Sequence, residues 1–157
     1  MNLSLLQENL NLALSNVSRF VSSKNQLPIL SNILFSTDQG RLKLSATNLE
    51  LSINYWVGAK IDQEGSITIP SKEITEFVSY LPSGKIDLEL KNNLLTLSSE
   101  KNQSVFNSLP STDFPEFPPI NPETEFEVDV GLLTQAISQI SFSAATDDTR
   151  PVLTGIL

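Results

Sequence analysis

The chain has 157 residues, of which 39% are hydrophobic, and it carries a formal net charge of −8. That length and apolar fraction suffice for one ordinary domain with a hydrophobic core, or for one domain and part of another. Cysteine and histidine are both absent from the sequence. Disulfides, thiolate metal sites, cysteine nucleophiles, Ser-His-Asp catalysis and the usual zinc sites are therefore excluded within this stretch.

Targeting signals are also missing from the sequence. No apolar run approaches the roughly 20 residues needed to cross a membrane, and the opening residues MNLSLLQENL lack the charged start and apolar core of a signal peptide. These features predict a soluble protein that does not associate with membranes, and the cytoplasm as its compartment.

Charge is unevenly distributed along the chain. Residues 9–23 contain no acid and a single base, Arg19, and residues 130–146 contain no charged residue at all. An acidic chain is in general a poor ligand for nucleic acid, because affinity for phosphate comes mostly from Lys and Arg. The two charge-poor segments are typical of amphipathic helices with polar faces of Ser, Asn and Gln. The lack of acids would also keep these segments from repelling a polyanion such as DNA. From the residues alone, both the purely structural and the functional interpretation stay open.

The first half of the chain predicts one helix and several strands. Residues 2–6 predict a short strand, and the helical spacing of the apolar residues that follow predicts a helix over 8–21. The segment 27–35 (LPILSNILF) predicts a strand with a proline near its start, and the turn at 38–40 makes it a hairpin with the strand that begins at Arg41. Two further strands are expected in 49–61 and 66–70, the first with one face formed by Leu49, Leu51, Ile53 and Tyr55.

The second half predicts a short helix, a meander and a linker. Ser71 is placed to cap a helix over 71–80 whose inward side chains are Ile74, Phe77 and Val78. The alternating runs KIDLELK, NLLTLSS and QSVFNSL predict three strands of a meander. Residues 110–122 contain five of the nine prolines, and this composition predicts a stiff connection between domains. The sum is a strand-rich α+β domain with two helices on one face of the sheet.

The opening pattern of the chain returns after this linker. A shift of 123 residues pairs Leu10 with Leu133 and, across the loop, aligns the pattern P-x-L-x-x-I-L of residues 28–34 with residues 151–157. Such a repeat is longer than a solenoid unit of roughly 20–50 residues and indicates duplicated domains. Because the second copy stops at Leu157, inside its second strand, we expect the chain to be a truncated form of a longer protein.

Five stretches that span nearly the whole chain resemble the bacterial DNA polymerase III beta sliding clamp: LPILSNILF, LSATNLELSI, IPSKEITEFV, LPSTDFPEFP and FSAATDDTRPVLTGIL. The resemblance implies the DNA-clamp, or processivity factor, fold, an α+β arrangement of antiparallel sheets with two helices per domain. It implies a first domain over residues 1–109, a proline-rich linker over 110–122 and the start of a second domain over 123–157, with the third domain absent.

The function that the resemblance implies is that of a sliding clamp. Two subunits of three domains each would join head to tail into a ring that encircles duplex DNA without reading its sequence and confers processivity on the replicative DNA polymerase. The implied partners are duplex DNA, a second copy of the full-length chain, the polymerase and the clamp loader. No catalytic residue, cofactor or metal is expected, so the chain would be a non-catalytic subunit of the polymerase holoenzyme.

The resemblance also implies site residues. Helices 8–21, 71–80 and 130–143 would line the hole, with DNA contacts at four basic residues, Arg19, Lys24, Lys72 and Arg150. Glu73 and Glu76 interrupt this basic lining, and Asp147 beside Arg150 is unfavourable for phosphate. The last strand and the second helix of domain 1 would meet the partner subunit, through Phe77, Ser104, Val105 and Phe106. Of the pocket that captures polymerase and loader peptides, Leu153 is the one candidate.

Two other classes of function compete with the clamp. A carboxylate enzyme would use Asp147 and Asp148 to bind a metal or activate water, although adjacent acids in a loop are usually solvated or cap a turn. An acidic, strand-rich interaction module without DNA function is the second alternative. Secretory targeting would support that module, and the sequence shows none.

Overall fold

A computed structural model describes residues 1–21, 27–117, 127–145, 147 and 150–156. It divides the chain into two compact units, Met1–Phe117 and Pro118–Leu157. The start of the predicted linker belongs to the first unit, where it forms the 3-10 helix η3 (Ser111–Asp113) and buries Phe114. Residues 118–122 of that linker lie outside the described residues, so the exact limits of linker and second domain stay a prediction.

The first unit contains two antiparallel sheets. One has the strand order β5-β1-β7-β8-β9 and consists of β1 (Asn2–Leu6), β5 (Lys60–Gln63), β7 (Lys85–Lys91), β8 (Leu94–Ser98) and β9 (Gln103–Asn107). The other has the order β4-β3-β2-β6 and consists of β2 (Asn32–Asp38), β3 (Arg41–Thr47), β4 (Ser52–Gly58) and β6 (Ser66–Pro70). The meander predicted for the last three strands is confirmed.

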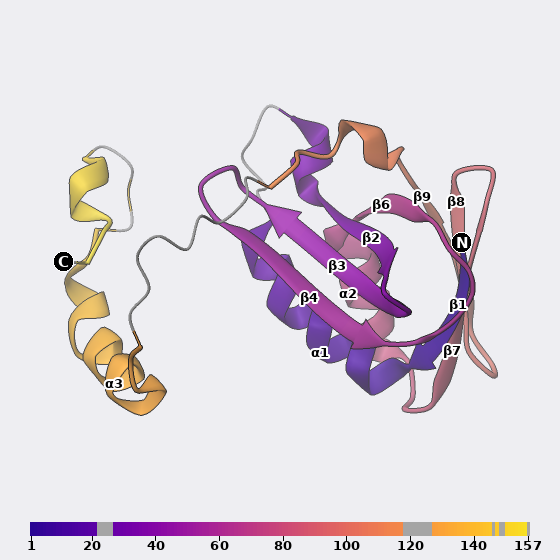
Figure 1. Cartoon of the computed structure of the whole chain (residues 1–157), viewed down its shortest axis with the longest axis horizontal. Helices are drawn as coiled ribbons and strands as arrows, with labels where there is room; N and C mark the ends of the chain where they lie inside the picture. The colour runs from indigo at the N-terminus through magenta and orange to yellow at the C-terminus, as the bar shows by residue number, and fades with distance from the viewer. Residues whose placement is uncertain (22–26, 118–126, 146, 148–149, 157) are drawn as a thin grey trace. The chain divides into compact units, whose positions relative to one another are not determined.

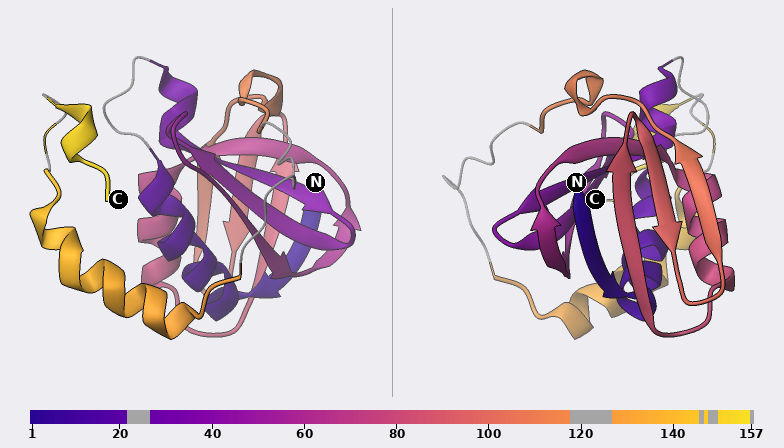
Figure 2. Two further views of the ribbon diagram at one scale, coloured as in Figure 1. Left: turned by 60° about the vertical axis from the view of Figure 1, so that its left-hand side comes forward. Right: turned by 90° about the vertical axis from the view of Figure 1, so that its right-hand side faces the viewer.

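The two sheets are joined at two places. A single residue, Ala59, separates β4 from β5, so the chain passes directly from the edge of one sheet to the edge of the other. On the opposite side, Leu109 exchanges two backbone hydrogen bonds with Thr68 of β6, with N–O distances of 3.0 and 3.1 Å. The sheets therefore curve around one common core (Figure 2).

Two helices cover this core: α1 (Gln7–Val17), which continues into the 3-10 helix η1 (Ser18–Phe20), and α2 (Ser71–Tyr80). Figure 1 shows both behind β2, β3 and β4. Six of their apolar side chains, at helical spacing, have no exposed surface: Leu10, Ala13, Leu14, Val17, Ile74 and Val78. The side chain of Gln7, itself buried, donates a hydrogen bond from Nε2 to the carbonyl of Val78 at 2.7 Å. This bond fixes the start of α1 against the end of α2.

Strand alternation separates the core face from the outer face of each sheet. In β3, Leu42, Leu44 and Ala46 are fully buried, whereas Arg41 and Lys43 lie on the other face. Burying a large aliphatic side chain contributes about 1.5–3 kcal/mol. The alternation that predicted the strands thus also decides which residues face solvent.

The second unit contains α3 (Val130–Ile140) and the 3-10 helices η4 (Ser141–Ser143) and η5 (Pro151–Leu153). The shift of 123 residues places both ends of α1 on those of α3, and both ends of η1 on those of η4. The sequence repeat is therefore also a repeat of secondary structure. No residue of α3 is buried.

Some local predictions were wrong. In the predicted strand 27–35, Pro28–Ser31 form a 3-10 helix, η2, and the strand begins only at Asn32. Proline fixes φ and lacks an N–H, which suits the first turn of a helix. Leu49 and Leu51 do not continue the face of β4, because the Asn48 side chain accepts hydrogen bonds from the N–H groups of residues 50 and 51 and closes a turn. Leu49 has a φ of +77° there.

Predictions about helix starts also need correction. Ser71 does not cap α2: Pro70 holds the cap position, and Ser71 is the buried first residue of the helix. In the second unit, the described residues before α3 form no strand, and Asp129 caps the helix by accepting a hydrogen bond from the N–H of Leu132 at 2.9 Å. Pro151 starts a 3-10 helix, like Pro28 in the first copy.

Gly65 packs directly against the buried first residue of the chain. A Cβ added to Gly65 would lie 2.9 Å from the Cβ of Met1, so we expect Gly65→Ala to lower the free energy of unfolding by about 1–3 kcal/mol through overpacking. Gly58→Ala is the matched control, because a Cβ there meets nothing within 4 Å. Urea unfolding measures the stability of both variants. Equal losses of stability would contradict the close packing of Gly65 against Met1.

Candidate functional site

The outer face of α1 presents one row of side chains. Glu8, Leu12, Ser15 and Arg19 are exposed and follow one another at intervals of three or four residues, the spacing of a single helix face. The corresponding row in the second unit, 123 residues later, is Gly131, Gln135, Ser138 and Phe142, and it contains no acid. The second row contains no charged residue, as the sequence predicted, whereas the first has Glu8 at one end and Arg19 at the other.

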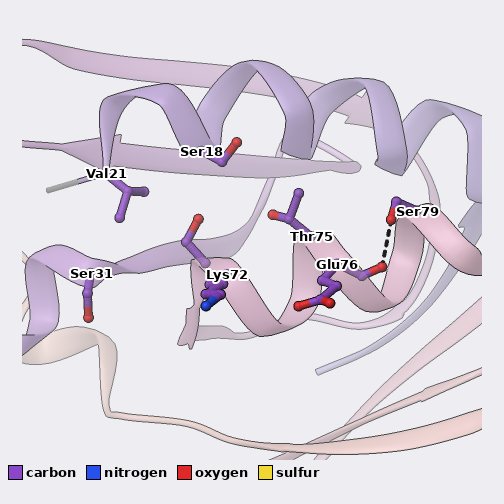
Figure 3. Close-up of a pocket in the computed structure, with 8 residues that line it drawn as sticks. Ser18, Val21, Ser31, Lys72, Thr75, Glu76 and Ser79 are labelled. Atoms are coloured by element: carbon purple, nitrogen blue, oxygen red, sulfur yellow. Dashed lines mark hydrogen bonds between the residues drawn. The ribbon is translucent and has the colours of Figure 1, made fainter. Parts of the chain in front are cut away.

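A groove of about 530 Å³ lies between the segment that follows α1 and one side of α2, from Ser71 to Ser79 (Figure 3). Hydroxyl groups dominate its lining, and its two charged residues, Lys72 and Glu76, both come from α2. The lining residues are Ser18, Val21, Ser31, Ser71, Lys72, Thr75, Glu76 and Ser79. The sequence predicted Lys72 but none of these hydroxyl residues, because they come from separate segments and share no sequence motif.

The helix pair is antiparallel, so its cations gather at one end. Gln7 at the start of α1 bonds to Val78 near the end of α2, whereas Ser18 after α1 shares the groove with Ser71, which begins α2. Arg19 and Lys72 therefore lie toward the same end, and neither forms an ion pair with another described residue. Glu8 lies toward the opposite end. The third predicted DNA contact of the first copy, Lys24, is outside the described residues.

The N-terminal end of α2 lies at this groove, with Glu73 in its first turn. Pro70 at the cap position provides no side-chain acceptor, so the N–H groups of the first turn have no cap, and the helix dipole favours an anion there. The Oγ1 of Thr75 is buried without a hydrogen-bond partner among the residues that the structure describes. Such a surface can make weak contacts to phosphate. Among the described residues no group of three or more His, Cys, Asp or Glu is placed to hold a metal ion.

The predicted subunit interface lies at the edge strand β9 and the adjoining side of α2. Phe77 packs edge-to-face on Phe106, with ring centroids 5.7 Å apart. Phe106 is only 5% exposed, so it supports Phe77 from the core and does not itself offer surface. Val105 is 55% exposed, and Ser104 is half-buried. Tyr80, 81% exposed, was missed by the sequence reasoning, although its position three residues after Phe77 places it on the same side of α2.

The outer edge of β9 carries unpaired backbone groups. Ser108 N–H bonds to the carbonyl of Asn93, and Ser99 N–H to that of Asn102. Because hydrogen-bonded pairs alternate along an antiparallel ladder, the N–H and C=O groups of Gln103, Val105 and Asn107 point away from β8. An open edge of this kind is a template for pairing with another strand.

The second unit holds the other two predicted site residues. The N–H of Leu153 bonds to the carbonyl of Arg150 at 2.9 Å, and its own carbonyl accepts from Ala145 at 2.8 Å. Both side chains are exposed, Leu153 by 50%. Asp147 is exposed as well, whereas Asp148 lies outside the described residues, so the arrangement of this carboxylate pair is not defined.

Comparison with known proteins identifies similar sequences. The sequence model of the DNA polymerase III beta subunit, N-terminal domain, matches residues 1–118. The beta sliding clamp of Synechocystis is 34% identical over 99% of this chain and 42% of its own length. That of Caulobacter vibrioides is 35% identical over 92% of this chain and 40% of its own length. The chain thus spans less than half the length of these relatives.

Solved structures of the same class have a similar fold. The Caulobacter crescentus pol III beta structure matches with a TM-score of 0.91 at 33% identity, over 99% of this chain and 42% of that chain. The DNA polymerase sliding clamp of Bacillus subtilis matches with a TM-score of 0.91 at 26% identity, over 99% and 43%. The predicted clamp fold is therefore confirmed.

The helices of the structure are short compared with a membrane span. Within the described parts of the chain, none is long and apolar enough to cross a bilayer.

Proposed function

The chain belongs to the DNA polymerase III beta subunit family, and on that premise we propose that it forms the first domain, and the beginning of the second, of a sliding clamp. The whole protein would join a second copy of itself in a ring around duplex DNA and hold the replicative polymerase there. The family is non-catalytic, so this role requires positioning and no chemistry. A protein that acts on replicating DNA in a bacterium works in the cytoplasm.

One observation carries the proposal: the chain repeats α1 as α3, and Glu8 is the single acid in the two helices. The two helices have corresponding limits, 123 residues apart, and in a ring each copy would face the same duplex. Hydroxyls and a few cations give weak phosphate contacts without base readout, which is what sliding requires. Arg19, Lys24 and Lys72 would supply these contacts in the first domain, and Arg150 in the second.

Ring closure would use the open edge of β9. The outward backbone groups of Gln103, Val105 and Asn107 can extend a sheet into a partner subunit. Phe77 and Val105 would add apolar contact, with Phe106 behind them and Ser104 at the margin. In the head-to-tail arrangement that we propose, the partner surface is a different one from that of β9.

Partner peptides are a further part of the proposal. A Helicobacter pylori beta clamp has been solved bound to a DNA ligase peptide. For the present protein, we place the capture of polymerase and clamp-loader peptides in the region of Leu153, whose side chain is half exposed.

Charge reversal at the cationic end of the helix pair tests the DNA contacts. In the full-length protein, the double variant Arg19→Glu, Lys72→Glu is expected to bind duplex DNA more weakly. Its salt dependence should fall by about 0.9 in the logarithmic slope for each phosphate that the protein no longer neutralises. Fluorescence anisotropy of labelled duplex DNA at several salt concentrations measures both quantities.

The control for this experiment is Lys85→Glu, Lys91→Glu, which makes the same change in net charge on the strand β7, outside the helix pair. Both lysines are in exposed ion pairs, which contribute little to stability. If the control weakens DNA binding as much as the helix variant, net charge alone is responsible and the assigned contacts are wrong.

Proline at Val105 tests the strand edge. The N–H of Val105 points away from β8. Val105→Pro therefore removes no hydrogen bond of the sheet but deletes a donor to a partner strand. We expect the dissociation constant of the full-length dimer to rise by roughly a factor of ten, as measured by sedimentation equilibrium.

Val105→Thr keeps both the N–H and the branched shape and is the matched control for the proline variant. Circular dichroism verifies that both variants are folded. An unchanged dimer constant in folded Val105→Pro would place the subunit interface elsewhere.

A further inference from the structure

Four side chains form a cluster on the outer face of the sheet β4-β3-β2-β6, which we call the Trp56 cluster: Asp38, Arg41, Lys43 and Trp56. In β3 and β4 the neighbouring residues Leu42, Leu44 and Val57 are buried in the core. By strand alternation Arg41, Lys43 and Trp56 therefore point to the opposite side. The helices α1 and α2 cover the other face (Figure 1), so this cluster lies apart from the proposed DNA-binding surface.

The indole of Trp56 is held in place by its neighbours. Its Nε1 donates a hydrogen bond to Oδ2 of Asp38 at 2.7 Å. The guanidinium carbon of Arg41 lies 5.8 Å from the ring centroid, and Nζ of Lys43 lies 5.9 Å from it. Lys43 and Trp56 are directly opposite in the strand register, where side chains interact most closely. The ring nevertheless remains 41% exposed.

The two cations of the cluster, Arg41 and Lys43, can pair with the carboxylates of a ligand. Within the described parts of the chain, neither Arg41 nor Lys43 forms an ion pair with a carboxylate, although the protein carries a net charge of −8. Asp38 lies opposite Arg41 in the strand register, and its carboxylate accepts the hydrogen bond of the indole N–H. A pre-ordered Trp beside an Arg is the composition that dominates binding energy at protein interfaces, because little side-chain entropy remains to be lost.

We propose that the Trp56 cluster is a docking site for an acidic segment of a partner protein. Carboxylates of the segment pair with Arg41 and Lys43, and an apolar side chain beside them covers the exposed part of the indole. Charge complementarity selects the partner, since most of the remaining surface of this acidic protein repels such a segment. The site is independent of the ring and of its DNA contacts.

A single-stranded nucleic acid is the rival occupant, because it too carries negative charge. It binds to aromatic residues by stacking bases on a free ring face. Here the cations lie over the ring of Trp56, which leaves less of the face for a base. The geometry therefore favours carboxylates over bases.

Trp56 itself reports on binding, because it is the single tryptophan of the chain. The chain is titrated with a synthetic peptide of alternating glutamate and leucine, and the tryptophan emission is followed. We expect a saturable change that weakens with salt. In the double variant Arg41→Gln, Lys43→Gln the affinity should fall at least about tenfold, equivalent to about 1.4 kcal/mol.

The matched control is Lys60→Gln, Lys91→Gln, which removes two exposed lysines elsewhere on the first unit and should keep the affinity of the unaltered chain. Thermal unfolding of both double variants verifies that they are folded. Three results would overturn the proposal: no emission change up to millimolar peptide, equal affinities of the two double variants, or tighter binding of oligothymidylate than of the acidic peptide.

Discussion

The packing of α1 and α2 against one face of the sheet is the constraint on which the rest of the structure depends. Leu10, Leu14 and Ile74 have no exposed surface, and the hydrogen bond from Gln7 to Val78 fixes the two helices side by side. Once these faces are buried, the polar residues of both helices must face outward together. The groove and the cationic end both follow from this one arrangement.

The periodic spacing of apolar residues predicted most of the fold, because each helix or strand must turn one side toward the buried core. The limits of α2 and the meander of β7, β8 and β9 were predicted closely, since each alternates between core and solvent along its length. The predictions that failed concern turns. Pro28 begins a 3-10 helix before its strand, and the Asn48 side chain closes a turn where an apolar alternation continued in the sequence. Local hydrogen bonds decided the structure there.

The candidate site was only partly predictable from the sequence. Arg19 stood out as the single base of residues 9–23, and the family resemblance implied Lys72. Their position at one end of the pair follows from the antiparallel helix packing. Ser31 and Ser71 join the groove from separate segments. The Trp56 cluster likewise depends on the register that places Lys43 opposite Trp56, and alternation alone does not give a register. No sequence motif marks the residues of the candidate site, so their assignment as DNA contacts came from the resemblance to a known family.

The most direct test of the central claim is whether the full-length protein encircles DNA. The protein is loaded onto closed circular DNA with a clamp loader, and the fraction that stays bound is measured by gel filtration before and after a single cut linearises the circle. A ring held by topology stays on the circle and slides off the cut ends at the same salt concentration. Equal retention on circular and linear DNA would show that direct contacts, and not encirclement, hold the protein there.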